Sequence, residues 1–247
     1  MWSFCRITVA AIICASAAST LSAQLIPNDT YYAQYQWYSP VIGEPTAWAI
    51  STGSSSVTVA VLDDGVVSYT PDLAGRILPA LSAVTGQQPF TDAWLTNTSL
   101  NGGLNCHGTW VASTVAMQVN NAMGGAGVGN FSILPIRITQ TNLNALDSSM
   151  ANGIRMAADN GAKVINISYY ASDYATLDAA AAYARSKGAL TFIAAGNTDA
   201  YRSISAYSNL IFVSGTQENG QRWSEGNGVG SSYGAFVDIA APASNIL

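Results

Sequence analysis

Charged side chains are scarce in this sequence. Asp, Glu, Lys and Arg make up 9% of its 247 residues, against about a quarter in ordinary soluble proteins. The hydrophobic share of 49% is enough for one substantial core. Such a composition suits a rigid, loop-rich extracellular protein better than a disordered chain or a coiled coil. The net charge is -5 and basic residues form no cluster, so nucleic acid is not expected as a partner.

Cysteine is scarce too, and two of the three lie within residues 1–23. We interpret these residues as a secretory signal peptide, with a positive start at Arg6, an apolar run over 7–21 and a small-residue cleavage site at 21–23. The alternative is an uncleaved anchor, but the run is short and rich in Ala and Ser. Signal removal leaves only Cys106, which excludes an internal disulfide. We therefore expect a secreted monomer, extracellular or periplasmic, with no membrane attachment.

Short apolar runs alternate with segments of helical spacing, and no repeat or linker divides the chain after the signal. Strands are predicted at 56–62, 133–138, 163–167, 189–195, 210–214 and 236–240. Helices are predicted at 108–119, 149–160 and 174–187. This alternation predicts an α/β fold, a doubly wound and mostly parallel sheet with helices on both faces. Ligands bind such folds at the carboxyl ends of the strands.

Chemically suggestive residues follow three of these strands, namely Asp63, Ser168 and Asn197. The one histidine of the chain, His107, opens a predicted helix. A buried carboxylate beside an imidazole fixes its tautomer for general-base catalysis. A side-chain amide after Gly196 can donate to a developing oxyanion. The alternatives are a structural histidine, a turn-forming Asp in Asp-Asp-Gly, and a plain Asn turn.

Three sequence blocks follow one another along the chain, with Asp, His and Asn in that order: VAVLDDG at 59–65, HGTWVA at 107–112 and AAGN at 194–197. They resemble the Asp, His and oxyanion-Asn blocks of the subtilisin family of serine proteases (subtilases, peptidase S8). The likeness is strongest to the thermitase-like branch and covers almost all of the chain after the signal. Other segments that resemble this branch are 27–29, 47–48, 71–75 and 161–168.

The resemblance implies a secreted serine endopeptidase that acts on polypeptides. Asp63 would orient His107, His107 would serve as general base and then general acid, and Asn197 would stabilise the oxyanion. The substrate cleft would be bordered by Ser168, Tyr169 and Tyr170 on one side and by Ala194, Ala195 and Gly196 on the other. Tyr170 stands where the family has a glycine, which alters the expected shape of the specificity pocket. A substrate strand would pair with the protein backbone by β-augmentation.

The resemblance also implies a structural Ca²⁺ site, because residues 120–125 are similar to the family's calcium loop. Calcium binds six to eight oxygens, with carbonyls mixed among carboxylates. The matching ligands would be the carboxylates of Asp29 and Asp72, the side chain of Asn121, and the carbonyls of Gln118, Met123 and Gly125. The alternative is a Gly/Asn turn that holds no ion.

The family's nucleophile has no match in this sequence. It belongs to a Gly-Thr-Ser-Met-Ala block after a segment like 236–242, and the chain ends at Leu247 within that connection. Residues 214–217 have Gln in the serine's place, and the G-x-S-x-G match at 230–234 precedes a predicted strand and lacks a later histidine. We therefore expect residues 24–247 to be a peptidase domain without its C-terminal part, inactive on its own.

The sequence leaves three alternatives to the truncated endopeptidase. A secreted pseudoprotease or peptide-binding module would not need Asp63, His107 and Asn197 together, and neither would a noncatalytic matrix module. Cys106 could serve as a thiol nucleophile, but adjacent residues at a helix start point in different directions.

Overall fold

A computed structural model of the chain describes residues 24–97 and 106–247, so the predicted signal peptide lies outside the described part. The helices are α1 (Tyr32–Tyr35), α2 (Tyr38–Val41), α3 (Glu44–Ile50), α4 (Asp92–Leu95), α5 (His107–Ala116), α6 (Asp147–Asp159) and α7 (Tyr174–Ser186), with a 3₁₀ turn η1 (Pro71–Leu73). The main strands are β1 (Thr58–Asp63), β2 (Leu81–Ser82), β3 (Ser132–Arg137), β4 (Val164–Ile167), β5 (Leu190–Ala194), β6 (Leu210–Thr216) and β9 (Ile239–Pro242). A small hairpin joins β7 (Ser224–Gly226) to β8 (Val229–Gly230).

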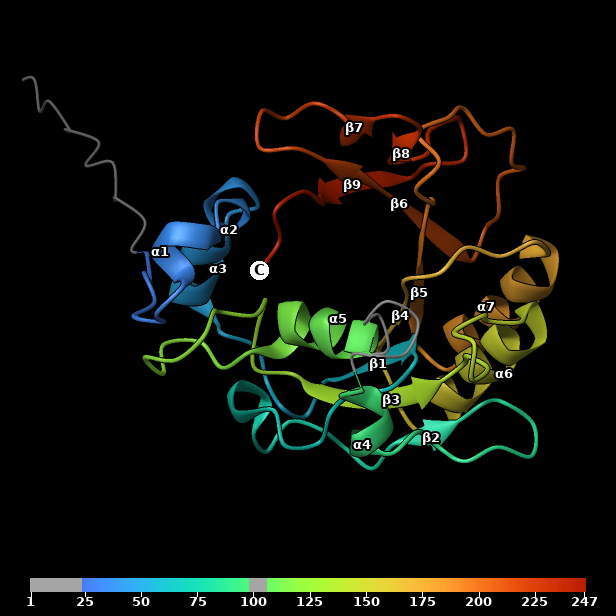
Figure 1. The fold of residues 1–247 in the computed structure, drawn as a ribbon, viewed down its shortest axis with the longest axis horizontal. Helices are drawn as coiled ribbons and strands as arrows, with labels where there is room; N and C mark the ends of the chain where they lie inside the picture. Colours follow the sequence, from blue (N-terminus) through green and yellow to red (C-terminus); the bar gives the residue numbers. More distant parts are fainter. Residues whose placement is uncertain (1–23, 98–105) are drawn as a thin grey trace, which may run out of the picture.

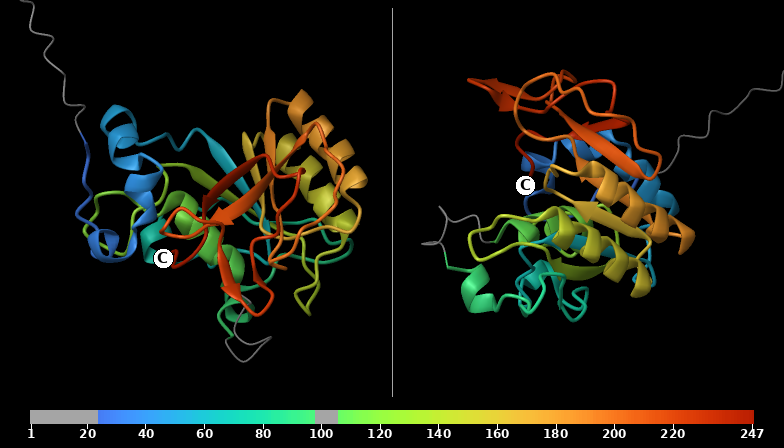
Figure 2. Two further views of the ribbon diagram at one scale, coloured as in Figure 1. Left: turned by 90° about the horizontal axis from the view of Figure 1, so that it is seen from above. Right: turned by 90° about the vertical axis from the view of Figure 1, so that its right-hand side faces the viewer.

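The main sheet runs in the order β2-β3-β1-β4-β5-β6-β9, and every neighbouring pair is parallel. Side chains of alternate residues in β1 point to opposite faces of the sheet, as the two-residue period of a strand requires. Val59 and Val61 pack with Ala112 of α5, whereas Leu62 packs with Ile154 of α6. Figures 1 and 2 show α6 and α7 side by side as one layer, with α5 apart from them. The predicted doubly wound α/β fold is confirmed.

The side of the sheet to which successive strands are added changes at β1. It passes from β1 through α5 to β3 on one side, then through α6 to β4 on the other side of β1. The segments that follow β1 and β4 therefore diverge at the carboxyl edge of the sheet, where such folds bind ligands. Asp63 ends β1 and Ser168 follows β4, so both lie at this edge.

The last strand begins three residues later than the predicted span of 236–240. Phe236 is buried and its ring lies edge-on to Phe212, with centroids 5.1 Å apart. The Val237 N–H donates to the carbonyl of Gly234 at 3.3 Å, which makes this stretch a turn. The prediction was wrong here because apolar residues in a buried turn look like a strand in sequence.

The N-terminal helices α1, α2 and α3 lie beside the C-terminal residues, at the left of Figure 1. Trp37 donates through Nε1 to the carbonyl of Ser244 at 3.1 Å. The side-chain amide of Gln36 donates to the Ala126 carbonyl and accepts the Ala126 N–H, both at 2.7 Å. The N-terminal arm, the region that carries α1 to α3, is thus fixed to the segment after the predicted calcium loop. Within the described ranges, no helix has the length and apolar character needed to cross a membrane.

Candidate active site

Asp63 and His107 meet at the carboxyl edge of the sheet. Asp63 is the last residue of β1 and is fully buried, and His107 is the first residue of α5. The Nδ1 atom of His107 lies 2.9 Å from both Oδ1 and Oδ2 of Asp63. The imidazole side chain is 35% exposed, so the ring combines a buried carboxylate partner with access to solvent.

This arrangement stabilises the charged imidazole. The hydrogen bond to Asp63 is the largest cause that raises the pKa of His107, and the negative charges of Asp63 and Asp64 add to it. Burial of the ring acts in the opposite direction but is outweighed. An imidazole that readily becomes an imidazolium suits a base that accepts a proton during a reaction.

Asp64, which the sequence indicated only as part of the Asp-Asp-Gly turn, contacts the helix that carries His107. It is fully buried, and its two carboxylate oxygens accept the backbone N–H groups of His107 at 3.1 Å and Gly108 at 2.8 Å. These are among the N-terminal amides of α5 that lack helical partners, so Asp64 fixes the start of the helix that carries His107. Burial, with the neighbouring charge of Asp63, raises the pKa of Asp64 to about 7.

Two aromatic rings and a thiol complete the surroundings of His107. Tyr169 and Trp110 lie edge-on to the imidazole, with centroids at 5.9 and 6.4 Å. Burial and the charge of Asp64 raise the pKa of the Cys106 thiol. Because the thiolate is the nucleophilic form, this environment disfavours the alternative of a thiol nucleophile.

A hollow of about 220 Å³ lies between the carboxyl ends of β4, β5 and β6. Its lining includes most of the predicted substrate-binding residues, namely Ser168, Ala194, Ala195 and Gly196, and also Asn197. The rest of the lining includes Trp223 and Ser231 of the hairpin region, which the sequence reasoning did not identify.

A second hollow of about 230 Å³ is lined by His107, Leu143, Ser168 and Tyr169. Ser168 lines both hollows, so it links the His107 region to the Asn197 region. Tyr170 lines neither of these two hollows and is 67% exposed. Asn197 follows Gly196 at the end of β5 and is exposed.

The residues of the predicted calcium site also come together. The carboxylate of Asp29 accepts the backbone N–H groups of Asn120 at 2.7 Å and Asn121 at 3.1 Å. Asp72 accepts the Nδ2 amide of Asn121 at 2.8 Å. The N–H of Gln118 donates to the carbonyl of Asp72 at 3.0 Å. Segments more than 40 residues apart in sequence therefore meet at this loop.

One predicted ligand is turned away from the arrangement that calcium needs. Asn121 presents its amide nitrogen to Asp72, while its Oδ1 accepts the N–H of Met123 at 2.9 Å. The Oδ2 atom of Asp72 is buried and has no hydrogen-bond partner within the described residues. Burial, with the like charge of Asp29, raises the pKa of Asp72. In the described part of the chain, no three His, Cys, Asp or Glu side chains converge as a metal cluster, so an ion here would depend on amide and carbonyl oxygens.

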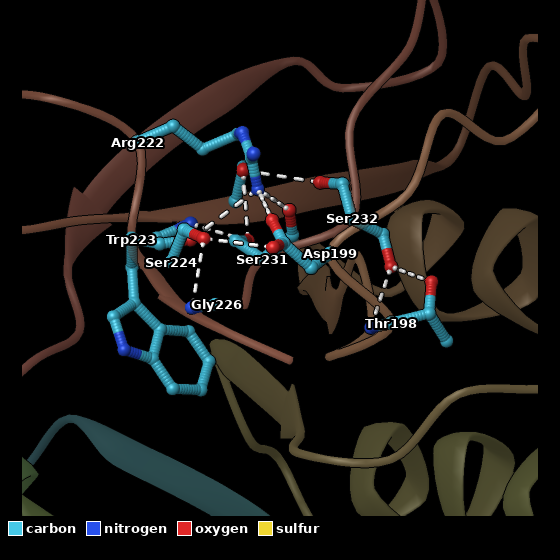
Figure 3. A network of polar contacts seen from close by, with 10 residues as sticks. Thr198, Asp199, Arg222, Trp223, Ser224, Gly226, Ser231 and Ser232 are labelled. Carbon is cyan, nitrogen blue, oxygen red and sulfur yellow. Dashed lines mark hydrogen bonds and ion pairs between the residues drawn. The ribbon is translucent and has the colours of Figure 1, made fainter. Parts of the chain in front are cut away.

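A polar network behind Asn197 was missed by the sequence reasoning. It joins residues 198–199 to the β7–β8 hairpin through side chains of Arg222, Ser224 and Ser232 (Figure 3). No local motif marks these residues, because the partners lie 23 to 34 positions apart.

The chain is similar to known proteins in sequence and in fold. The model of the subtilase family of peptidases matches residues 54–247. Thermitase of Thermoactinomyces vulgaris is 38% identical over 222 residues, which cover 88% of this chain and 74% of that protein. A thermophilic serine proteinase of Bacillus sp. (strain AK1) is 35% identical over 230 residues, with 92% and 53% covered, so the chain spans about half of that relative. Among solved structures, a protease of Pseudoalteromonas arctica PAMC 21717 gives a TM-score of 0.65 at 29% identity, over 87% of this chain and 72% of that one.

Proposed function

Because the chain belongs to the subtilase family, whose members are serine proteases, we propose that it carries the Asp, His and oxyanion parts of an endopeptidase site. The observation that carries the proposal is the contact of His107 Nδ1 with both carboxylate oxygens of Asp63, at 2.9 Å. Substrates of this site are polypeptides, bound as an extended strand beside residues 168–170 and 194–196.

In this proposal each residue has a defined role. Asp63 keeps the proton of His107 on Nδ1, which leaves Nε2 to take a proton from an attacking hydroxyl. The same Nε2–H then protonates the leaving amine, while Asp63 stays ionised and stabilises the imidazolium. The side-chain amide of Asn197 donates to the oxygen that becomes negative as the peptide carbonyl is attacked.

We assign no nucleophile within this chain. Of the two segments that partly resemble nucleophile motifs, residues 214–217 have Gln217 in the serine's place. The serine of the other segment, Ser232, is fully buried and its Oγ lies 2.9 Å from that of Thr198, which supports its exclusion. The chain by itself is therefore proposed to bind polypeptides without cleaving them.

A structural Ca²⁺ ion belongs to the same proposal. Two features of the loop fit a cation: the buried, unpartnered Oδ2 of Asp72 and the mutual repulsion of Asp72 and Asp29. Rotation of the Asn121 amide would present Oδ1 in place of Nδ2. The ion would then be held by Asp29, Asp72 and Asn121 together with the carbonyls of Gln118, Met123 and Gly125. Its role would be to join the N-terminal arm to the segment after α5.

Export completes the proposal, and the chain is proposed to act as a monomer. Export is supported by residues 1–23, whose sequence has the charge and apolar pattern of a secretory signal.

The His107–Asp63 pair can be tested directly, because His107 is the only histidine in the chain. Its pKa can be followed by NMR on protein labelled at histidine. We expect the pKa of His107 to lie above that of an unstructured peptide and to fall in an Asp63→Asn variant. An Asp178→Asn variant is the matched control, because that carboxylate bonds Asn209 instead. Equal titration in wild type and Asp63→Asn would remove the pair from the proposal.

The absence of a nucleophile is tested by incubating the purified chain with casein. No cleavage beyond that seen with an Asp63→Asn, His107→Ala double variant is expected. Casein cleavage that depends on His107 would show that a nucleophile is present.

A further inference from the structure

Asn197 is flanked by two residues that are both bonded to Ser232. The N–H of Ser232 donates to the carbonyl of Gly196 at 2.8 Å. The N–H of Thr198 donates to Ser232 Oγ at 3.3 Å, and the two hydroxyl oxygens lie 2.9 Å apart. Figure 3 shows both contacts between Ser232 and Thr198. One buried serine thus holds the backbone on each side of Asn197.

The side chain of Asn197 has no such support of its own. Within residues 24–97 and 106–247 no hydrogen bond fixes its amide, and the residue is exposed. Its direction therefore depends on the backbone at positions 196–198. An oxyanion donor is effective only when it is aimed beforehand at the place where charge develops, so whatever fixes this backbone also fixes the donor.

Gly196 allows Ser232 to approach this closely. Its φ of +100° lies in the region that favours glycine. A Cβ atom at this position would lie 3.1 Å from Ser232 Oγ. The loop conformation and the serine contact are therefore matched to each other.

Ser232 is itself held firmly. It is fully buried, and its carbonyl accepts the hydroxyl of Ser214 in β6 at 3.2 Å. The contact thus ties the loop after β5 to the adjacent strand of the main sheet. A rigid support of this kind limits the motion of the residues bonded to it.

A charged contact holds the next residue of the loop. Arg222 donates to Asp199 Oδ1 and, at 2.6 Å, to the carbonyl of Ser231. Ser224 donates to Asp199 Oδ2 at 2.7 Å, and the Asp199 N–H bonds the carbonyl of Gly230 at 2.8 Å. This second attachment keeps the loop against the β7–β8 hairpin, so Ser232 does not act on an otherwise loose segment (Figure 3).

From these contacts we infer that Ser232 is a positioning residue for Asn197, which it aims by bonding Gly196 and Thr198. The inference rests on the proposed role of Asn197 as oxyanion donor. It gives the serine of the G-x-S-x-G match a function other than nucleophilic attack. It also predicts that the Ser232 hydroxyl affects recognition of a negative oxygen more than recognition of the rest of a peptide.

The test compares two peptides on the full chain, N-acetyl-Ala-Ala-Ala-Phe as the free carboxylate and as the C-terminal amide. The carboxylate places a negative oxygen where the oxyanion would form, and phenylalanine suits the largely apolar hollow beside Ser168. Each Kd is measured by calorimetry at pH 6, and the ratio of the amide Kd to the carboxylate Kd is the readout. For wild type we expect a ratio of about ten, because one hydrogen bond to a charged group lowers the carboxylate Kd about tenfold.

We expect the ratio to fall about tenfold in Asn197→Ala, and to fall by a similar factor in Ser232→Ala. Ser132→Ala is the matched control, since it removes the hydroxyl of another buried serine, which donates to the Ser55 carbonyl at 2.7 Å and lies outside the Asn197 loop and both hollows. This control should affect both peptides alike and leave the ratio unchanged, as a purely structural defect would.

The possible outcomes distinguish a failure of the Ser232 inference from a failure of the proposed role of Asn197. A wild-type ratio near one, an unchanged ratio in Asn197→Ala, or no binding of either peptide overturns the role of Asn197 and the inference with it. A ratio that falls in Asn197→Ala but stays at the wild-type value in Ser232→Ala overturns the inference alone. If Ser232→Ala does not fold, Thr198→Val decides: a lowered ratio supports the inference, and an unchanged ratio overturns it.

Discussion

The Asp63–His107 pair and the loop at residues 118–125 both collect acidic side chains from distant parts of the chain, but they differ in what balances the charge. At the pair, a partner that can become cationic is built into the protein, because the His107 imidazole lies 2.9 Å from the carboxylate. At the loop, Asp29 and Asp72 receive only neutral N–H groups. One Asp72 oxygen remains buried and unpartnered in the described residues.

The difference shows where each site obtains its rigidity. The pair is set by the end of a central strand and the start of a helix, so its geometry follows from the main sheet. The loop is built from turns, and its side chains bond one another in an arrangement that calcium would have to change. The first site is therefore expected to be preformed, and the second to depend on an added cation.

The largest effect is expected when calcium is supplied to the loop. At free Ca²⁺ one hundred times its Kd, the free energy of unfolding should rise by about 2.7 kcal/mol. Calorimetric melting in Ca²⁺ and in EDTA measures this. Asp72→Asn should abolish the difference, whereas Asp92→Asn, an exposed carboxylate bonded to Ser68, should keep it. Identical melting curves with and without Ca²⁺ would remove the metal from the proposed function.

An effect of similar size is expected from crowding the preformed site. A Cβ on Gly108 would meet the Gly65 carbonyl oxygen and lie 2.8 Å from the Cβ of Asp63. Gly108→Ala should therefore push α5 away from β1 and cost about 1–3 kcal/mol of the free energy of unfolding.

The same variant should lower the pKa of His107, because the hydrogen bond to Asp63 is lengthened. Chemical denaturation and the NMR titration measure the two effects, and Ser113→Ala on the same helix is the control. A Gly108→Ala protein with wild-type stability and an unchanged His107 titration would contradict the rigidity ascribed to this site.

A third effect is expected from Asp64, as a change in how stability depends on pH. Its pKa rises from 3.8 to about 7 on folding. Between these values the folded state binds the proton that the unfolded state has lost, so this contribution to stability is full below pH 3.8 and disappears as pH rises through 7. Asp64→Asn cannot titrate, and the melting temperature of wild type minus that of the variant should fall from pH 4.5 to pH 8. A pH-independent difference would contradict the raised pKa.

The Asp63–His107 pair could be predicted from the sequence because its residues sit at element boundaries that apolar patterning reveals. Asp63 ends a buried run, and His107 opens a helix. The strand at 236–240 was misplaced because Phe236 and Val237 are apolar without being extended. The amide orientation of Asn121 could not be predicted, because it depends on which neighbouring atoms need a donor.

The contacts of Ser232 are another feature that could not be predicted from the sequence. The neighbourhood of this serine resembles a nucleophile motif, and the sequence could only reject that role. What it does instead depends on Thr198 and Gly196, more than 30 positions earlier, and no local pattern records that pairing.

By itself the sequence determined the family and the parallel sheet and indicated Asp63, His107 and Asn197 as candidate site residues, because hydrophobic periodicity and short motifs are local properties of a chain. The tertiary structure alone decided that Asp64 caps the helix of His107, that Ser232 and the Asp199–Arg222 contact hold the loop of Asn197, and that Asp72 keeps an unpartnered oxygen. Those features are contacts between segments distant in sequence, and only the packing of the folded chain fixes which polar atoms meet.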